Sequence, residues 1–212
     1  DSGKWTFHQL SNAESWTTDL SGLRPHQIAN KGMVRTFQLT KSLAKMTVID
    51  NMLLGAAEQK GESLRNALLP SRWQKQEKEI LEKAEDLLER FKLSHMRDEY
   101  AATLSGGQRK LLEMARALMS EPKLILLDEP MAGVNPVLVE SLLVHIENLR
   151  DEGVSVLFIE HDMDAIMGIS DWIVVLAEGQ VIAEGTPSDV SKNPAVIDAY
   201  LGSAIAEELK DV

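Results

Sequence analysis

KLILLDEP, residues 123–130, is a short and almost wholly apolar run that ends in two acids and a proline. Runs of this length and composition are typical of strands buried on both faces of a parallel sheet. VSVLFIE, residues 154–160, has the same character. Between the two runs, Asn135 can cap and Pro136 can open a helix with leucines at helical spacing. The stretch therefore predicts two neighbouring parallel strands joined by a right-handed crossover helix.

Helical and hairpin patterns flank this unit. EKEILEKAEDLLERFKL, residues 77–93, carries one apolar stripe at helical spacing, which predicts an amphipathic helix. Nearer the start we expect a short strand over Lys4–His8 and a short helix within residues 25–32. WIVVLAEGQVIAEG, residues 172–185, predicts a hairpin. The fold class is therefore α/β with an inserted helical region.

The composition excludes several classes of function. The chain has 33 acidic and 22 basic residues, a formal net charge of −11. This charge argues against a large nucleic-acid surface, because such surfaces need clustered Lys and Arg. The chain has no cysteine, so disulfides, thiol nucleophiles and cysteine-based zinc sites are excluded. No apolar run approaches the roughly 20 residues that cross a bilayer, and no secretory signal pattern is visible, so we expect a cytosolic protein.

Three polar side chains follow the two predicted strands. Asp128 and Glu129 end the first strand, at the carboxyl edge where open α/β sheets place their ligands. An acid there can hold Mg²⁺, and its neighbour can orient or deprotonate an attacking water. His161 follows the next strand, so we expect it at the same edge, where it can donate a hydrogen bond to a phosphate oxygen. The alternatives are a helix cap or solvated turn for the acids and a structural role for the histidine.

LSGGQ, residues 104–108, opens another predicted helix. Gly106 and Gly107 lack side chains, so a ligand can approach backbone N–H groups at the positive end of the helix dipole. Ser105 can cap this helix and offer its hydroxyl to a phosphate oxygen. The pattern predicts an anion-binding helix start, with a flexible turn and a capping serine as the alternative.

Together these motifs resemble the ATP-binding subunits of ABC transporters over essentially the whole chain. LSGGQ matches the family's signature, which meets the ATP held by a partner subunit. LILLDE resembles the Walker B strand, which makes Asp128 a Mg²⁺ ligand and Glu129 the catalytic base. His161 matches the switch histidine, RTFQ resembles the Q-loop, in which Gln38 is a Mg²⁺ or water ligand, and MAGVNP occupies the place of the D-loop. The resemblance assigns nucleotide binding to Gln38, Leu104, Ser105, Gly106, Gly107 and Gln108.

The resemblance also implies a parallel-sheet core of the P-loop NTPase type with an inserted α-helical subdomain. Residues 1–38 would be the remnant of the catalytic core up to the Q-loop, and 39–118 the helical subdomain that ends in the signature helix. Residues 119–202 would be the α/β core and 203–212 a tail. The connection over 9–22 is longer than the family's usual one.

ATP and Mg²⁺ are the cofactors that the resemblance implies. The implied partners are a second ATPase subunit, transmembrane permease subunits and, indirectly, a substrate-binding protein. The chain would lie in the cytoplasm, peripherally on the inner face of the cell membrane, without a nucleic-acid partner.

The phosphate loop of that family, G-x-x-x-x-G-K-[ST], does not occur in the sequence. Gly3-Lys4 is not followed by Ser or Thr, so we interpret it as a turn that enters a strand. The match begins downstream of the loop, through truncation, omission or natural loss. Because the loop supplies the main electrostatic contacts to the transferring phosphoryl group, we expect this chain alone to bind ATP poorly and to hydrolyse it negligibly.

Three stretches resemble a narrower group, the ATPases of branched-chain amino acid importers: residues 32–56, 127–136 and 181–202. The expected function is therefore that of an energy-coupling subunit that dimerises head-to-tail over ATP and hydrolyses it. Two alternatives remain. One is a non-catalytic partner that contributes only a signature face, and the other is a soluble ABC ATPase of DNA repair or translation.

Overall fold

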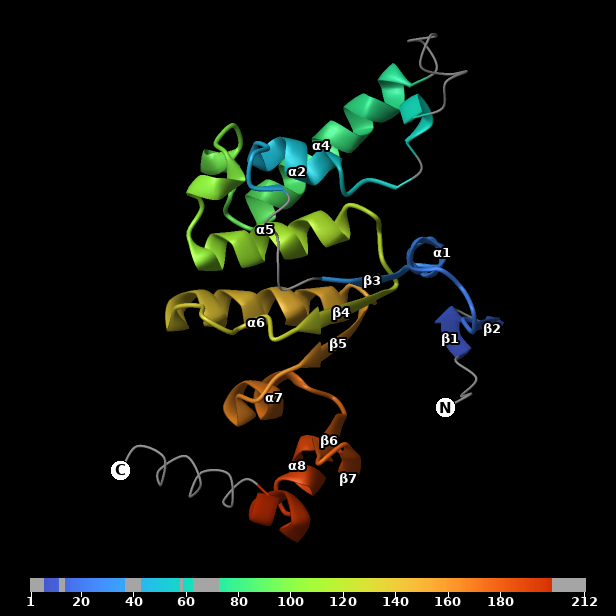
Figure 1. Ribbon diagram of the computed structural model, residues 1–212, viewed down its shortest axis with the longest axis vertical. Coiled ribbons are helices and arrows are strands. Elements are labelled where there is room, and N and C mark those ends of the chain that lie inside the picture. The colour runs from blue at the N-terminus through green and yellow to red at the C-terminus, as the bar shows by residue number, and fades with distance from the viewer. Residues whose placement is uncertain (1–5, 12–13, 37–42, 58, 63–72, 200–212) are drawn as a thin grey trace. The chain divides into compact units, whose positions relative to one another are not determined.

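The computed structural model describes residues 6–11, 14–36, 43–57, 59–62 and 73–199, with the backbone alone described over 6–18 (Figure 1). The chain folds as two compact units, residues 1–159 and 160–212. Among the described residues, no helix combines the length and the hydropathy that crossing a membrane requires.

A parallel sheet forms the centre of the first unit (Figure 1). Its strands β3 (Met33–Arg35), β4 (Leu124–Asp128) and β5 (Ser155–Ile159) pair in the order β3-β4-β5. Helix α6 (Pro136–Asp151) connects β4 to β5 and packs against β5. Asn135 caps α6, because its side chain accepts a hydrogen bond from the Val137 N–H at 2.8 Å. The predicted strand–helix–strand unit and its parallel pairing are therefore confirmed.

The burial of β5 differs from the prediction. On β4, Ile125 and Leu127 are buried, but on β5 Leu157 and Ile159 are 52% and 61% exposed. In the sheet that the described residues form, β5 is an edge strand, so it has a neighbouring strand on one side only. Helix α6 packs against β5 but leaves the side chains of Leu157 and Ile159 exposed. The prediction that both apolar runs are buried on both faces is wrong for β5.

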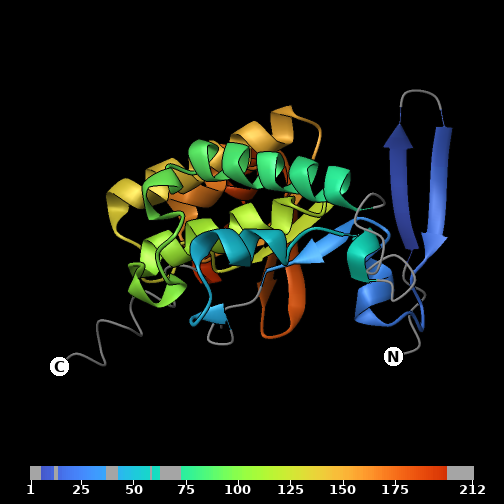
Figure 2. The same cartoon turned by 90° about the horizontal axis from the view of Figure 1, so that it is seen from above.

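The start of the chain contains a hairpin that the sequence only partly predicts. Strand β1 (Thr6–Ser11) pairs antiparallel with β2 (Glu14–Asp19), as Figure 2 shows. Residues 9–22, which we expected to form a long connection, therefore include the end of β1 and the whole of β2. The predicted short helix is confirmed as α1 (Pro25–Ala29), with Pro25 at its first position.

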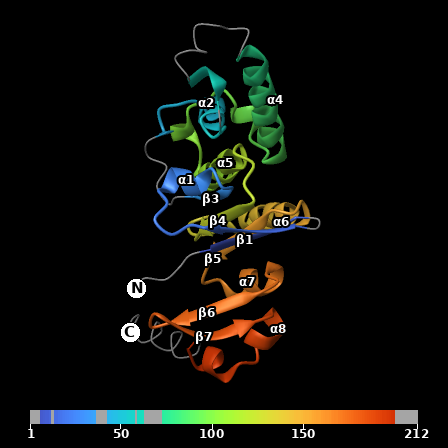
Figure 3. The same ribbon diagram turned by 90° about the vertical axis from the view of Figure 1, so that its right-hand side faces the viewer.

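The described part of the helical lobe of the first unit contains three α-helices and the turns near them (Figure 3). They are α2 (Val48–Leu53), α4 (Gln74–Arg90) and α5 (Gly106–Leu118). The predicted apolar stripe on α4 is confirmed, because Ala84, Leu88 and Phe91 are buried. The intervening 3-10 turns are η2 (Lys60–Glu62), η4 (Ser94–Met96) and η5 (Ala101–Thr103).

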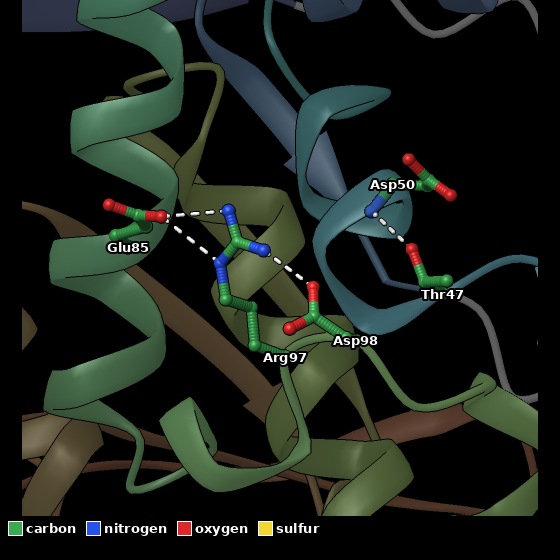
Figure 4. Close-up of polar contacts among 5 residues, drawn as sticks. All are labelled: Thr47, Asp50, Glu85, Arg97 and Asp98. Atoms are coloured by element: carbon green, nitrogen blue, oxygen red, sulfur yellow. Dashed lines mark hydrogen bonds and ion pairs between the residues drawn. The ribbon is translucent and has the colours of Figure 1, made fainter.

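Polar contacts fix the start of α2 to the chain that follows α4 (Figure 4). The Thr47 hydroxyl accepts the Asp50 N–H at 3.1 Å, which caps the helix. The Ile49 N–H donates to the main-chain oxygen of Arg97 at 2.9 Å. The Arg97 guanidinium in turn donates to Glu85 of α4 at 2.9 and 3.0 Å and to Asp98. Because the first N–H groups of a helix have no acceptors within the helix, these contacts define where α2 begins.

His145 of α6 is buried where α6 meets the end of α4. Its ring stacks on Phe91, with centroids 4.2 Å apart and planes inclined by 25°. Neither ring nitrogen has a hydrogen-bond partner in the described part of the chain. Burial, and then the charges of Arg90 and Lys92, lower the pKa of His145 below its usual 6.5. The folded chain therefore favours neutral His145.

This burial predicts a loss of stability in acid. When the pH falls below about 6.5, the unfolded chain gains a proton at His145 that the folded chain resists, so the free energy of unfolding decreases. Urea unfolding at pH 7.5 and 5.5 measures this. His145→Phe keeps the stacked ring and should show a smaller decrease than the unmodified chain. His95→Phe, at an exposed histidine, should show the same decrease as the unmodified chain. An equal decrease in the free energy of unfolding for both variants would contradict the role of His145.

The second unit contains α7 (Met163–Ile169), the strands β6 (Ile173–Ala177) and β7 (Gln180–Gly185), and α8 (Pro187–Val190). The two strands pair antiparallel, which confirms the predicted hairpin. Glu178 and Gly179 form the turn with φ values of 50° and 76°. Positive φ at both central residues is the geometry of tight hairpin turns. Ile173, Ala183, Val190 and Val196 form the core of this unit.

Candidate functional site

Asp128 is the last residue of β4, and its carboxylate is held by a cation from the neighbouring strand. The Arg35 guanidinium, at the end of β3, donates to Asp128 Oδ2 at 2.7 Å. The side chain of Asp128 remains 27% exposed. The structure therefore places Asp128 at the carboxyl edge of the sheet, as predicted, and adds Arg35 as its partner.

Glu129 follows in a conformation that few residues other than glycine adopt. Its φ is +45°, in the left-handed region. Its N–H donates to the Ile159 oxygen at 3.0 Å, and its own oxygen accepts the Lys110 ammonium at 2.8 Å and the Ala132 N–H at 3.2 Å. Such strained residues persist where the surroundings hold them, and they are concentrated at functional sites. The backbone of Glu129 is thus fixed from β5 on one side and from α5 on the other.

The start of α5 is capped in the manner that the sequence predicts. The Ser105 hydroxyl accepts the Gln108 N–H at 3.2 Å, and the Gln108 side chain accepts the Ser105 N–H at 2.9 Å. This reciprocal pair is a capping box. Helix geometry leaves the N–H groups of Gly106 and Gly107 without acceptors inside the helix.

The surroundings of Gly106 and Gly107 differ, so the lack of a side chain has a different consequence at each. A Cβ at the exposed Gly106 would meet nothing closer than the Gly133 oxygen at 3.9 Å, so the space beside it is open. Gly107 is buried, and a Cβ there would lie 2.4 Å from Leu138 Cδ1 of α6. We expected both glycines to open the backbone to a ligand. That expectation fits Gly106, whereas the packing of α5 against α6 accounts for Gly107.

The side chain of Leu104 packs in the interior of the fold. Its side chain is 2% exposed, and its carbonyl accepts the Arg109 guanidinium at 3.0 Å. The predicted contact of Leu104 with nucleotide therefore does not extend to its buried side chain, which anchors the helix start instead.

Two predicted site residues cannot be placed beside Asp128 and Glu129. Gln38 falls outside the described residues. His161 belongs to the second unit, where its side chain is 80% exposed and its N–H donates to Glu160 Oε2 at 3.3 Å. The predicted meeting of His161 with Glu129 stays a prediction.

Sequence reasoning missed Arg35 and Lys110. Arg35 stands in the RTFQ run, at the end of the strand beside β4, so strand order would have pointed to it. Lys110 lies on the second turn of α5, half-buried, and gives no signal of its own in the sequence. Arg35 contacts Asp128 directly. Lys110 borders a pocket that Asp128 also lines, together with Thr36, Glu113, Met114, Leu127, Pro130 and Leu142.

Comparisons with known proteins agree with one another. A family model described as "ABC transporter" matches residues 7–132, more than half of the chain, and one described as "Branched-chain amino acid ATP-binding cassette transporter" matches residues 180–206. The probable branched-chain amino acid transport ATP-binding protein LivG of Archaeoglobus fulgidus is 48% identical over 89% of this chain and 73% of its own length. The high-affinity protein BraF of Pseudomonas aeruginosa is 41% identical over 88% and 74%.

Solved structures show the same similarity. An ATP-binding cassette of an ABC transporter in its ADP conformation superposes with a TM-score of 0.72 at 40% identity, over 91% of this chain and 79% of that one. A nucleotide-free cassette superposes with a TM-score of 0.71 at 39% identity, over 90% and 78%.

Proposed function

Because the chain belongs to the ABC transporter family of ATP-binding cassettes, in its branched-chain amino acid group, we propose that it is the energy-coupling ATPase subunit of an importer for branched-chain or related amino acids. The single observation that supports this most is the end of β4. There Asp128 is partly exposed beside Arg35, and Glu129 is held in a strained backbone conformation. Both are the residues that the chemistry of phosphoryl transfer needs at a strand end.

The roles of the side chains follow from their chemistry. Glu129 orients or deprotonates the water that attacks the γ-phosphate, and His161 donates a hydrogen bond to a γ-phosphate oxygen. Ser105 and the open backbone at Gly106 receive the phosphates of ATP bound by a second subunit.

Mg²⁺ fits the donors of this site. It prefers oxygen ligands and binds through one or two carboxylates together with phosphate oxygens, which suits Asp128 with the amide of Gln38. When bound with ATP, the ion neutralises charge on the phosphates. Arg35 contacts Oδ2 of Asp128 and so fixes the direction of the carboxylate that would hold the ion.

The partners and location belong to the same proposal. Relatives of this chain are named as transport ATP-binding proteins, which supports a second ATPase subunit, permease subunits and an indirect link to a substrate-binding protein. The chain would then lie on the cytoplasmic face of the membrane. Its net charge of −11 favours these partners over nucleic acid.

We further propose that this chain alone has negligible ATPase activity, because its sequence lacks the phosphate loop. A non-catalytic module that supplies only a signature face is the second candidate, and it rests on the capped helix start at Ser105 and the open space beside Gly106. Activity after a phosphate loop is restored in the same chain would separate the two, because a degenerate module would stay inactive.

A mixing experiment tests the signature face. The partner is an intact relative that keeps its phosphate loop but carries a disabled signature, so its own dimers are inactive. ATP hydrolysis should appear on adding this chain. Gly106→Asp should lower the rescued rate at least about tenfold, because a carboxylate there repels phosphate while it favours the helix dipole and preserves the fold.

The control for this experiment places the same charge elsewhere. Gln74→Asp adds an acid to the exposed first turn of α4 and should leave the rescued rate unchanged. Equal rates for Gly106→Asp and Gln74→Asp would refute the signature assignment. Measurable ATP hydrolysis by this chain alone would refute the proposed inactivity.

A further inference from the structure

A contact on α5 links the signature helix to Glu129. The Lys110 ammonium donates to the main-chain oxygen of Glu129 at 2.8 Å, across 19 residues of sequence. Lys110 lies on the turn that follows the capping box of Ser105 and Gln108. It is half-buried and borders the same pocket as Asp128.

The acceptor of this hydrogen bond is a residue whose backbone needs support. Glu129 has a φ of +45°, and its N–H is already fixed to the Ile159 oxygen of β5 at 3.0 Å. A hydrogen bond from an ammonium is stronger than one between neutral groups. Lys110 thus holds the carbonyl side of a strained residue whose amide side is held by the sheet.

We propose that Lys110 is a positioning residue, which fixes the backbone of Glu129 and so sets the direction of its carboxylate. The inference rests on the proposed function, in which Glu129 is the base. It also has a geometric consequence. In the proposed dimer, the start of α5 serves the partner's ATP, while Glu129 serves the ATP of its own subunit. In that dimer, the hydrogen bond from Lys110 would join the helix that serves one nucleotide to the base that serves the other.

Amide hydrogen exchange on this chain tests the contact without any activity. Lys110→Met keeps the length of the side chain but removes the donor, and Lys110→Arg keeps a cationic donor. We expect exchange of the Glu129 and Ala132 amides to be about tenfold faster in Lys110→Met, and to return close to the unmodified rate in Lys110→Arg. Lys78→Met, at an exposed position of α4, should change neither amide.

Exchange in α6 serves as the internal reference. Unchanged exchange at Glu129 and Ala132 would overturn the proposal. So would faster exchange that is uniform over α6 and β4, because a general loss of stability would then explain it. A rise confined to these amides supports it.

The activity test uses this chain joined to a segment that carries the phosphate-loop sequence G-x-x-x-x-G-K-[ST]. Lys110→Met should lower kcat about tenfold with little change in the KM for ATP, since a displaced base slows the chemical step rather than binding. Lys110→Arg should recover most of kcat. An equal loss in Lys110→Arg, or a change in KM alone, would contradict positioning.

Glu129→Gln separates this inference from the function on which it rests. If Glu129→Gln leaves hydrolysis unchanged, the proposed base is wrong. If Glu129→Gln abolishes hydrolysis but Lys110→Met does not slow it, the base stands and the positioning role fails.

Discussion

Gly55→Ala is expected to lower the free energy of unfolding by about 2–3 kcal/mol. Gly55 follows α2, and its N–H donates to the Met52 oxygen at 2.8 Å. A Cβ at this position would lie 2.4 Å from the main-chain oxygen of Arg116 and 3.0 Å from Met119 Cβ. Because the first of these atoms is backbone, no side-chain rotation relieves the clash, and α2 must move away from the end of α5.

Urea unfolding of the two glycine variants measures this effect. Gly106→Ala is the matched control, since its Cβ would meet nothing closer than 3.9 Å. We expect it to stay within about 1 kcal/mol of the unmodified chain, because alanine favours helix over glycine by that amount. If both variants unfold at the same urea concentration, the close approach of α2 to α5 is not as tight as described.

Asn51→Leu is expected to cost about 2 kcal/mol or more, although the two side chains have similar volumes. Asn51 is 2% exposed, and its amide nitrogen donates to the main-chain oxygens of Leu43, Met46 and Thr47 at 3.1, 3.4 and 2.8 Å. Leucine removes this donor from three carbonyls at once. Residues 43–47 would lose these hydrogen bonds to α2 but keep the main-chain ones from Ala101 to Met46 and from Ala102 to Ala44.

Two measurements check this prediction. Urea unfolding gives the loss of stability, and Asn148→Leu, at an exposed position on α6, should change it little. Limited trypsin digestion should cut after Lys45 faster in Asn51→Leu than in Asn148→Leu, because the tie beside it is gone. If Asn51→Leu lost stability without faster cleavage after Lys45, the prediction that Asn51 holds the segment before α2 would be wrong.

Local patterns predicted much of the fold. The apolar runs around 124–128 and 155–159, the caps at Ser105 and Asn135 and the stripe on α4 all depend on near neighbours in the sequence, and the structure confirms them. The exposure of Leu157 and Ile159 could not be predicted, because it depends on which elements flank β5 in space. Strand β2 was not predicted, because ESWTTD has no regular alternation of apolar and polar residues.

The residues of the candidate site also fall into those that local sequence predicts and those that it does not. Asp128 and Glu129 were predicted from their place at the end of a strand, a property of the sequence. Arg35 and Lys110 were missed because each acts through a partner distant in the sequence, 93 and 19 residues away. Gly107 was expected to open the backbone to a ligand, but the contact that a Cβ there would make with Leu138 shows that packing of α5 against α6 excludes a side chain.

Two of the ion pairs that α4 makes join it to residues just beyond the ends of α5 and α6. Arg90 donates to Glu152, which ends α6, at 2.9 Å, and Lys83 donates to Glu121, beyond α5, at 2.7 Å. Both acids face water, where such pairs contribute little and weaken as salt rises. Raising the ionic strength therefore weakens only the charged rim of the contact between α4 and α6, because the buried stacking of Phe91 on His145 does not depend on charge.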